Sequence, residues 1–400
     1  MASKEFEQLR KVLKPGLAVA SDPPMLVREK MHRVHPTQFP ADVRVREQQL
    51  GGVASAFVET PESDGSDLVL LHVHGGAFVS TGLEHYIPYA ARLSRAFRAR
   101  VVIFAYRLAP ENRFPAALDD AVAVYRALLA ERISPGRIAV AGDSCGGGIG
   151  VAMLCRLRDD SSPLPAAFVG LTPWFDLEQT GESSQHLRGV DPYVNAEWIR
   201  KRGLDYVGDG DIRNPLASPI HANLSGLPPM FLSVGEIDTT RDDSTRLAAR
   251  AGRDGVAVTL EVNPEMIHGF HGLSDLLPEG HAALLRAAEF VRRHAARMAT
   301  PRCGAPKAPR HPRARACRRQ PGRPRAPAGA GSGSACCARG TRVPVPRNRA
   351  AILWLRRARR RPESRPPRCR PAAPARCRRR SWRAAQRLRS PGRVPASSLR

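Results

Sequence analysis

A glycine-rich run at residues 142–147 constrains the fold of this chain more than any other feature. It reads GDSCGG, follows the apolar segment 137–141 and precedes a helix-like apolar pattern at residues 149–158. A serine at a sharp turn between a strand and a helix is typical of the G-x-S-x-G nucleophile elbow, whose strained backbone leaves no room for side chains two positions away. The same run also fits ordinary α/β packing or a phosphate-binding loop, so this motif alone does not decide the function.

A second glycine-rich segment, HGGAF at residues 74–78, begins where the apolar segment 68–73 ends. Backbone N–H groups stabilise a developing oxyanion best where no side chain obstructs their approach, and consecutive glycines give that access. The alternative interpretation is a simple tight turn. For His74 itself we favour a hydrogen-bonded turn histidine over a catalytic role.

Two later segments supply an acid and a histidine. Asp238 follows the apolar run 230–234, and His268 follows the alternating run 256–262. A serine hydroxyl is a poor nucleophile until a histidine removes its proton, and a carboxylate must orient that histidine. The chain order of Ser144, Asp238 and His268 is the order found in α/β-hydrolases, where each residue sits on a loop after a different strand.

Taken together, these segments resemble the hormone-sensitive-lipase-like family of α/β-hydrolase esterases. Five ordered matches carry the resemblance, and they lie at residues 74–76, 106–116, 142–147, 238–242 and 268–270. The similarity extends over roughly residues 40–298, and the preceding segment is compatible with the family's N-terminal cap. Within that family, the run 224–229 and the pair Asp242 and Asp243 look similar to monoterpene ε-lactone hydrolases.

The resemblance implies a role for each matched residue. Ser144 is the expected nucleophile, His268 the general base and then general acid, and Asp238 the carboxylate that orients the histidine. The implied oxyanion hole consists of the backbone N–H groups of Gly75, Gly76 and Cys145. No metal and no organic cofactor is required.

Two positions depart from the family pattern. Ala77 stands where a third glycine is frequent, and Cys145 stands where alanine is usual. Alanine still permits close backbone approach, whereas a thiol beside the nucleophile predicts sensitivity to thiol reagents. Asp242 competes with Asp238 for the acid role, but the family pattern selects Asp238. We expect Asp242 to cap or charge the N-terminus of a helix at residues 244–251.

The apolar periodicity predicts an α/β fold. Strand-like runs occur at residues 43–45, 54–58, 68–73, 101–105, 138–141, 167–171, 230–234 and 256–262. Helical patterns occur at residues 87–97, 116–129, 149–157, 245–251 and 282–298. This alternation indicates a mostly parallel eight-stranded sheet with helices on both faces, in which the first two strands pair antiparallel.

Two helix-prone segments with proline interruptions do not fit the alternation, one from residue 4 to about 39 and one from 178 to about 224. In the family these positions form a helical cap over the active site. The resemblance therefore implies that five cap residues line an acyl pocket: Met25, Met31, Tyr193, Trp198 and Ile199. For any one of them, and for Trp174, simple core packing is the commoner role.

The net charge of +26 is confined to one end of the chain. Of the 63 Lys and Arg and 37 Asp and Glu, residues 301–400 carry 30 basic residues and a single acid, Glu363. Residues 1–300 are thus close to neutral and long enough for one α/β-hydrolase domain with its cap. The domain boundary is expected near Thr300.

Residues 301–400 are rich in Arg, Pro, Ala and Gly and carry almost no periodic apolar face. Such a segment cannot bury enough apolar surface to offset its ordering entropy, so we interpret it as a disordered tail. Its charge predicts non-specific, salt-dependent binding to polyanions. A frame shift in a GC-rich gene near codon 300 is an equally good explanation of the composition.

Six of the eight cysteines lie in this tail with irregular spacing, which makes a zinc site there improbable. Cys145 and Cys155 are too far apart on one turn and helix to form a disulfide. The first 14 residues are charged, and no run of about eighteen apolar residues occurs anywhere in the chain. The expected location is therefore the cytoplasm.

These features favour a serine carboxylesterase for short- to medium-chain esters, with a small-molecule ester or lactone as its partner. A lactone hydrolase and an N-acetyl hydrolase are the alternatives within the family, and a homodimer is compatible with it. A hypothesis from a different class is a non-catalytic binding module with a polyanion-binding tail. All three triad positions carry residues that can act in catalysis, namely Ser144, Asp238 and His268, and this argues against a non-catalytic module.

Overall fold

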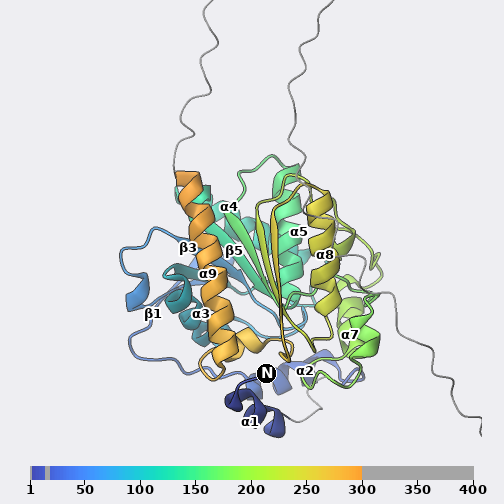
Figure 1. Ribbon diagram of the computed structural model, residues 1–400. Helices are drawn as coiled ribbons and strands as arrows, with labels where there is room; N and C mark the ends of the chain where they lie inside the picture. The colour runs from blue at the N-terminus through green and yellow to red at the C-terminus, as the bar shows by residue number, and fades with distance from the viewer. Residues whose placement is uncertain (1, 14–18, 300–400) are drawn as a thin grey trace, which may run out of the picture. The chain divides into compact units, whose positions relative to one another are not determined.

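In the computed structural model, which describes residues 2–13 and 19–299, an eight-stranded sheet runs through the described chain (Figure 1). The strands, in sequence order, are β1 (Arg44–Leu50), β2 (Val53–Glu59), β3 (Val69–Val73), β4 (Arg100–Phe104), β5 (Ile138–Asp143), β6 (Ala167–Leu171), β7 (Met230–Gly235) and β8 (Val258–Asn263). The strand order in the sheet is β1-β2-β4-β3-β5-β6-β7-β8. All eight predicted strands are confirmed. The predicted tail and its cysteines lie outside the described residues.

The pairing pattern is mostly parallel. β1 pairs antiparallel with β2 and β2 antiparallel with β4, whereas β4, β3, β5, β6, β7 and β8 form one parallel run. Because parallel strands end at the same edge of a sheet, the loops after β5, β7 and β8 meet at one edge. This edge holds the segments that the sequence singled out.

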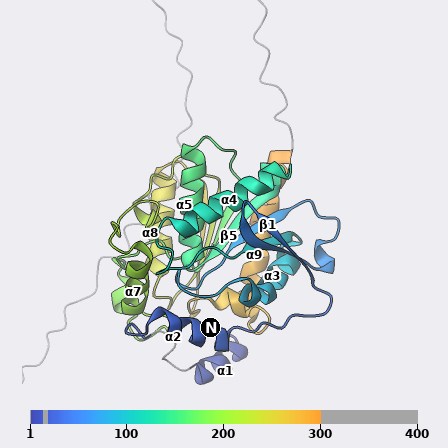
Figure 2. The ribbon, with the colours of Figure 1, turned by 180° about the vertical axis from the view of Figure 1, so that it is seen from behind.

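Helices cover both faces of the sheet (Figures 1 and 2). On one face, α3 (Leu83–Phe97) packs beside α9 (Pro278–Ala299). On the other face lie α4 (Ala116–Ala130), α5 (Cys145–Asp159) and α8 (Arg241–Arg253). The five predicted helices are therefore confirmed, although each of α3, α5, α8 and α9 begins about one turn earlier than the apolar pattern indicated.

Two hydrophobic cores hold the layers together, one on each face. Leu71 and Val140 belong to the core under α4, α5 and α8, whereas Leu70 and Ala141 belong to the core under α3 and α9. Successive side chains of a strand point to opposite faces, so a central strand that is buried on both sides is continuously apolar. This arrangement makes the central sheet a rigid base for the loops at its edge.

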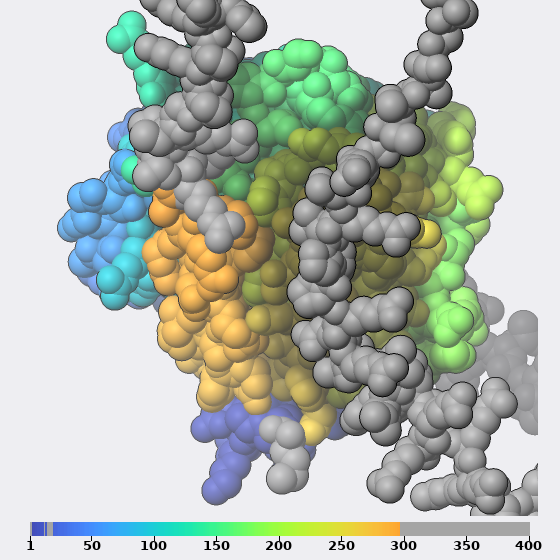
Figure 3. All heavy atoms as spheres, turned by 45° about the horizontal axis from the view of Figure 1, so that its top comes forward, coloured from blue at the N-terminus to red at the C-terminus, as the bar shows by residue number. Residues whose placement is uncertain are grey.

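The two segments outside the α/β alternation are helical at several points. They contain α1 (Lys4–Val12) and α2 (Pro24–Val34) in the first segment, and α6 (Ser183–His186) and α7 (Ala196–Val207) in the second. Phe6 of α1 is fully buried against Met266 and Ile267, which lie directly before His268. α1 lies at the N-terminal end of α9, where Ser3 donates a hydrogen bond to Glu279 (Figures 1 and 3).

Among the described residues, no helix has the length and apolar character needed to cross a membrane.

Candidate active site

Ser144 lies in the turn between β5 and α5 with φ 51° and ψ −126°. A positive φ is uncommon for a residue with a side chain and persists only where the surroundings enforce it. Here the surroundings are crowded. A Cβ atom at Gly142 would lie 2.4 Å from the Gly146 carbonyl oxygen, and one at Gly146 would lie 2.0 Å from the Val73 carbonyl oxygen. The predicted steric need for glycine two positions on either side of Ser144 is confirmed.

Ser144, His268 and Asp238 lie on the loops after β5, β8 and β7, and their side chains form one chain of contacts. Ser144 Oγ is 3.0 Å from His268 Nε2, and His268 Nδ1 is 3.0 Å from Asp238 Oδ1 and 3.2 Å from Oδ2. An ionised carboxylate only accepts hydrogen bonds, so His268 donates from Nδ1. Nε2 then faces the Ser144 hydroxyl as a hydrogen-bond acceptor.

The Asp238 carboxylate is completely buried and held in place by Thr240. Thr240 donates to Asp238 Oδ1 from its backbone N–H at 2.7 Å and from its hydroxyl at 2.9 Å. Burial on its own lowers the pKa of His268, but the charge and hydrogen bond of Asp238, together with the charges of Asp191 and Asp143, outweigh burial, and the net pKa is raised above the ordinary value. The imidazolium form of His268 is thereby stabilised.

A second buried carboxylate, Asp191, stands beside this group and was missed in the sequence. Its Oδ2 accepts hydrogen bonds from the backbone N–H groups of His268 at 3.4 Å and Thr239 at 3.3 Å. Burial and the nearby Asp238 charge raise the pKa of Asp191 to about 6. Asp191 therefore links the second cap segment to the loop that carries His268. The contact partners are distant in sequence, and no local motif marks the residue.

One predicted oxyanion donor is wrong. The backbone N–H of Gly75 is directed at the Tyr86 hydroxyl at 2.9 Å and at Asp143 Oδ1 at 3.0 Å, so it is not available to a substrate. For Gly76, no hydrogen bond from the backbone N–H to any described residue is found, and Gly76 lines the pocket beside Ser144. The N–H of Cys145 is the first of α5 and has no intrahelical acceptor.

The Cys145 side chain is buried inside the protein, away from solvent. Burial raises the pKa of its thiol to about 12. Its Sγ accepts a hydrogen bond from the backbone N–H of Phe78 at 3.2 Å, which ties the glycine-rich loop to the Ser144 turn. A buried thiol that stays protonated is unreactive, so this geometry argues against the sensitivity to thiol reagents that the sequence suggested.

His74 and Asp143 form hydrogen bonds that hold the glycine-rich loop beside the Ser144 turn. His74 Nδ1 lies 2.7 Å from the Gly75 carbonyl oxygen, its ring stacks on Tyr106, and burial lowers its pKa to about 4. The prediction of a turn histidine is confirmed. Asp143 accepts a hydrogen bond from the Tyr86 hydroxyl at 2.8 Å and contacts His72 Nε2 at 3.0 Å.

Of the two predicted roles of Asp242, charging the N-terminus of the helix is confirmed and capping it is wrong. α8 begins at Arg241, so Asp242 lies within its first turn, where a negative charge is favourable. Its Oδ2 accepts the backbone N–H of Ser183 at 2.7 Å instead of capping its own helix. The neighbouring Asp243 accepts the N–H groups of Phe175 and Asp176, each at 2.8 Å. Both carboxylates therefore connect α8 to the chain segment that follows β6.

A pocket of about 290 Å³ opens above Ser144 and His268. Three of the five predicted cap residues line it: Met31, Tyr193 and Trp198. Two do not, because Met25 is 66% exposed on the outer side of α2 and Ile199 is buried in the core. Trp174 is also a core residue, whose indole N–H donates to the Asp176 carbonyl oxygen. Sequence reasoning missed Leu9 and Leu13, which reach the pocket from the first segment.

Two groups of side chains in the described residues have a spacing suited to a metal ion. They consist of His32, Glu84 and His85, and of Asp176, Glu178 and His221. Neither group includes Ser144, Asp238 or His268. The Ser144 site is thus built from a hydroxyl, an imidazole, a carboxylate and backbone amides, which are the groups that acyl transfer uses.

Comparison with known proteins places this geometry in a family. Residues 70–272 match the family described as alpha/beta hydrolase fold. An acetyl-hydrolase from Streptomyces hygroscopicus is 39% identical over 243 residues, which are 61% of this chain and 81% of that protein. An esterase from Acinetobacter venetianus is 31% identical over 251 residues, which are 62% of this chain and 82% of that protein.

Solved structures agree with the sequence relatives. An esterase/lipase from an uncultured bacterium superposes with a TM-score of 0.70 at 36% identity, covering 74% of this chain and 100% of that chain. An esterase from the bacterial hormone-sensitive lipase family superposes with a TM-score of 0.70 at 37% identity, covering 74% and 99%. This chain belongs to the α/β-hydrolase fold family, within its hormone-sensitive-lipase-like esterases.

Proposed function

We propose that this carboxylic ester hydrolase cleaves short- to medium-chain carboxylic esters by two-step acyl transfer on Ser144. The observation that carries the proposal is the 3.0 Å contact between Ser144 Oγ and His268 Nε2 at the base of an apolar pocket. A hydroxyl at this distance from an imidazole that a buried carboxylate orients is an activated nucleophile.

In the first step, Ser144 Oγ attacks the ester carbonyl carbon while its proton moves to His268 Nε2. The negative charge on the carbonyl oxygen is stabilised by the backbone N–H groups of Gly76 and Cys145. His268 then protonates the departing alcohol, which leaves an acyl group on Ser144. Water repeats the sequence with His268 as base, and the carboxylic acid is released. Asp238 stays ionised and stabilises the imidazolium throughout.

The pocket supports a small apolar acyl group. Its volume of about 290 Å³ is at the lower end of the range typical of ligand sites. Its walls include apolar side chains from α1, α2 and the second cap segment: Leu9, Leu13, Met31, Val34, Val194 and Trp198. An acyl chain of a few carbons fits such a space, whereas a long fatty acyl chain needs the pocket to open.

An acetylated substrate, from which the enzyme would remove an acetyl group, is the second candidate. The similarity to the acetyl-hydrolase from Streptomyces hygroscopicus favours it, and acetyl is small enough for a pocket of about 290 Å³. A lactone substrate, which the sequence suggested through residues 224–229, stays an alternative prediction. A lactone, its open-chain ester and an N-acetyl amide assayed in parallel separate the three.

The variant Ser144→Ala tests the mechanism. We expect kcat/KM for p-nitrophenyl butyrate to fall by roughly 10⁴-fold or more, since the nucleophile and its base act as a unit. Ser225→Ala, at an exposed position, is the matched control and should retain full activity. Hydrolysis by Ser144→Ala at the control rate would refute the assignment of Ser144 as nucleophile.

The remaining sequence predictions are part of the same proposal. The domain boundary near Thr300, the cytoplasmic location, a homodimer and polyanion binding by residues 301–400 each stay a prediction. Truncation after Met298 tests the boundary: esterase activity should survive and polyanion binding should vanish. The opposite result would favour the alternative of a binding module.

A further inference from the structure

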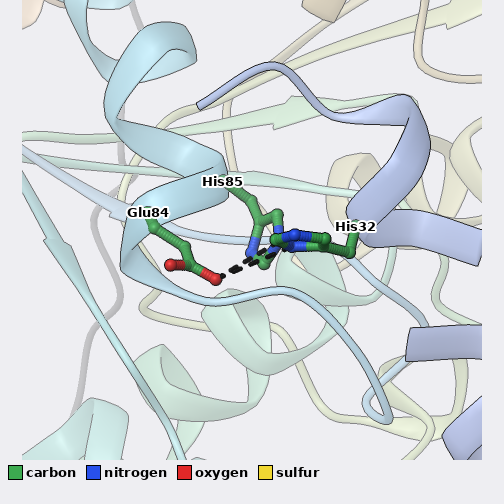
Figure 4. A group of neighbouring side chains, drawn as sticks. All are labelled: His32, Glu84 and His85. Atoms are coloured by element: carbon green, nitrogen blue, oxygen red, sulfur yellow. Dashed lines mark hydrogen bonds and ion pairs between the residues drawn. The ribbon is translucent and has the colours of Figure 1, made fainter. Parts of the chain in front are cut away.

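Three side chains that take no part in the Ser144–His268–Asp238 contacts converge between two helices (Figure 4). His32 projects from α2, while Glu84 and His85 project from the first turn of α3. His32 Nδ1 is 2.9 Å from His85 Nε2 and 3.9 Å from Glu84 Oε1. His85 Nε2 is 3.6 Å from the same carboxylate oxygen.

These distances match the spacing of ligands around one ion. Tetrahedral zinc with bonds of about 2.1 Å holds its ligand atoms roughly 3.4 Å apart. The three separations, 2.9, 3.6 and 3.9 Å, lie around this value, and all three atoms face one another. The nearby His35 is not a fourth ligand through its Nδ1, because that atom contacts the Met31 carbonyl oxygen at 2.9 Å.

We propose that His32, Glu84 and His85 bind a divalent transition-metal cation of the Zn²⁺ type, with water completing the coordination. Two neutral imidazoles and one carboxylate form a ligand set that suits zinc and its neighbours and is poor for Mg²⁺ or Ca²⁺, which prefer oxygen ligands. The cation replaces the single proton that the two facing imidazole nitrogens share in its absence. The three side chains already lie close together, so the site can form without a large rearrangement.

The surroundings allow a cation to enter and do not repel it. The side chains of His32 and Glu84 are 62% and 66% exposed, whereas that of His85 is 11% exposed. The site thus has an open side for water and a fixed side against the protein. The two positive side chains of α2 near it, Arg28 and Arg33, are neutralised by ion pairs with Glu111 and Glu29.

The site joins the cap to the hydrolase core. α2 belongs to the first cap segment and α3 packs on the central sheet, so a cation bound between them cross-links the two parts. His85 also lines the Ser144 pocket, as do Met31 and Val34 of α2. Binding of Zn²⁺ therefore stabilises the folded state and fixes one wall of the pocket.

Thermal unfolding of the full chain with and without ZnCl₂ tests the site. Because His32, Glu84 and His85 come together only in the folded protein, we expect the Tm of the wild-type protein to rise by about 2–4 °C. His32→Gln, at an exposed position, should abolish this rise and leave the Tm without zinc unchanged. Glu84→Gln should reduce the rise, and His281→Gln, an exposed histidine on α9, is the matched control that retains it.

Residues 301–400 contain six cysteines, and cysteine thiolate is a zinc ligand, so ligand identity needs its own readout. In Co²⁺-loaded protein, thiolate ligands give strong charge-transfer absorption, while imidazole and carboxylate ligands give only weak visible bands. The difference spectrum between wild type and His32→Gln should contain the weak bands without the thiolate absorption. An equal Tm rise in wild type and His32→Gln, or a difference spectrum without cobalt bands, would overturn the proposal. Neither readout depends on esterase activity.

Discussion

The turn around Ser144 and the cap that covers it are built in different ways. In the turn, backbone atoms leave no space for a side chain at Gly142, which faces Gly146, or at Gly146, which faces Val73, so backbone sterics define the conformation. In the cap, contacts between residues far apart in sequence define the position of each side chain, as for Asp191 with His268 and Phe6 with Met266. The comparison teaches that backbone crowding fixes the nucleophile turn, whereas the pocket wall depends on side-chain packing between distant segments.

The largest effect is expected in the turn. Gly146→Ala places a Cβ atom 2.0 Å from the Val73 carbonyl oxygen, which the crowded backbone cannot accommodate. We expect loss of esterase activity and a large drop in Tm, measured by p-nitrophenyl butyrate hydrolysis and thermal unfolding. Gly252→Ala in α8 is the control, because nothing lies within 4 Å of its Cβ position. It should be neutral or stabilising by roughly 0.5–1 kcal/mol. Equal effects of the two substitutions would contradict the steric account.

In the cap, a substitution should change selectivity and leave the chemistry intact. Met31→Ala enlarges the pocket, so the ratio of kcat/KM for octanoate over butyrate esters should rise by roughly tenfold. Met25→Ala, six residues earlier and on the outer side of α2, should leave the ratio unchanged. Steady-state kinetics on p-nitrophenyl esters of graded length measure both. A fall in activity on every ester alike would show that the cap also positions the reacting groups.

The contact between Asp191 of the cap and His268 should affect the pH dependence of kcat/KM. Burial lowers the pKa of His268, whereas nearby negative charges raise it. The charge of Asp191 is one of these, and its effect is smaller than that of Asp238. His268 must be neutral to act as base, so Asp191→Asn lowers its pKa and moves the acidic limb of kcat/KM to lower pH. We expect a shift of a few tenths of a pH unit, because Asp191 itself titrates at about 6 in the same range. Asp209→Asn, fully exposed, should cause no shift.

The smallest effect concerns the Cys145 thiol. Because burial keeps it protonated, iodoacetamide at pH 8 should leave esterase activity unchanged. Mass spectrometry of peptides reports which thiols react. Inactivation that parallels alkylation of Cys145 would show that the turn opens in solution and is less rigid than the crowding around Gly146 implies.

Much of the fold could be predicted because its signals are local. The central strands are buried on both faces and therefore appear as continuous apolar runs, such as β5 and β6. The starts of four helices were predicted one turn late, and for α5 and α8 the first turn does not follow the apolar pattern. α8 begins with Arg241 and Asp242, and α5 begins with Cys145 and three glycines.

In the candidate site, too, the predictions that failed are those that depend on contacts between distant segments. Gly75 was assigned wrongly because a motif reveals which amides are unhindered and cannot reveal that Tyr86 and Asp143 already occupy one of them. Met25 and Ile199 were misplaced for a similar reason: helical periodicity gives the face of a helix, and packing decides what that face meets.

The sequence by itself determined the strand and helix order, the turn at Ser144 and the identity of the three residues that meet there. Turn motifs and apolar periodicity extend over only a few residues, so they can be recognised in the sequence. Only the tertiary structure decided which amides remain free, which carboxylate stands beside Asp238 and which side chains form the pocket. Those outcomes depend on contacts between segments separated by up to hundreds of residues, because hydrogen bonds and burial are settled by proximity in space.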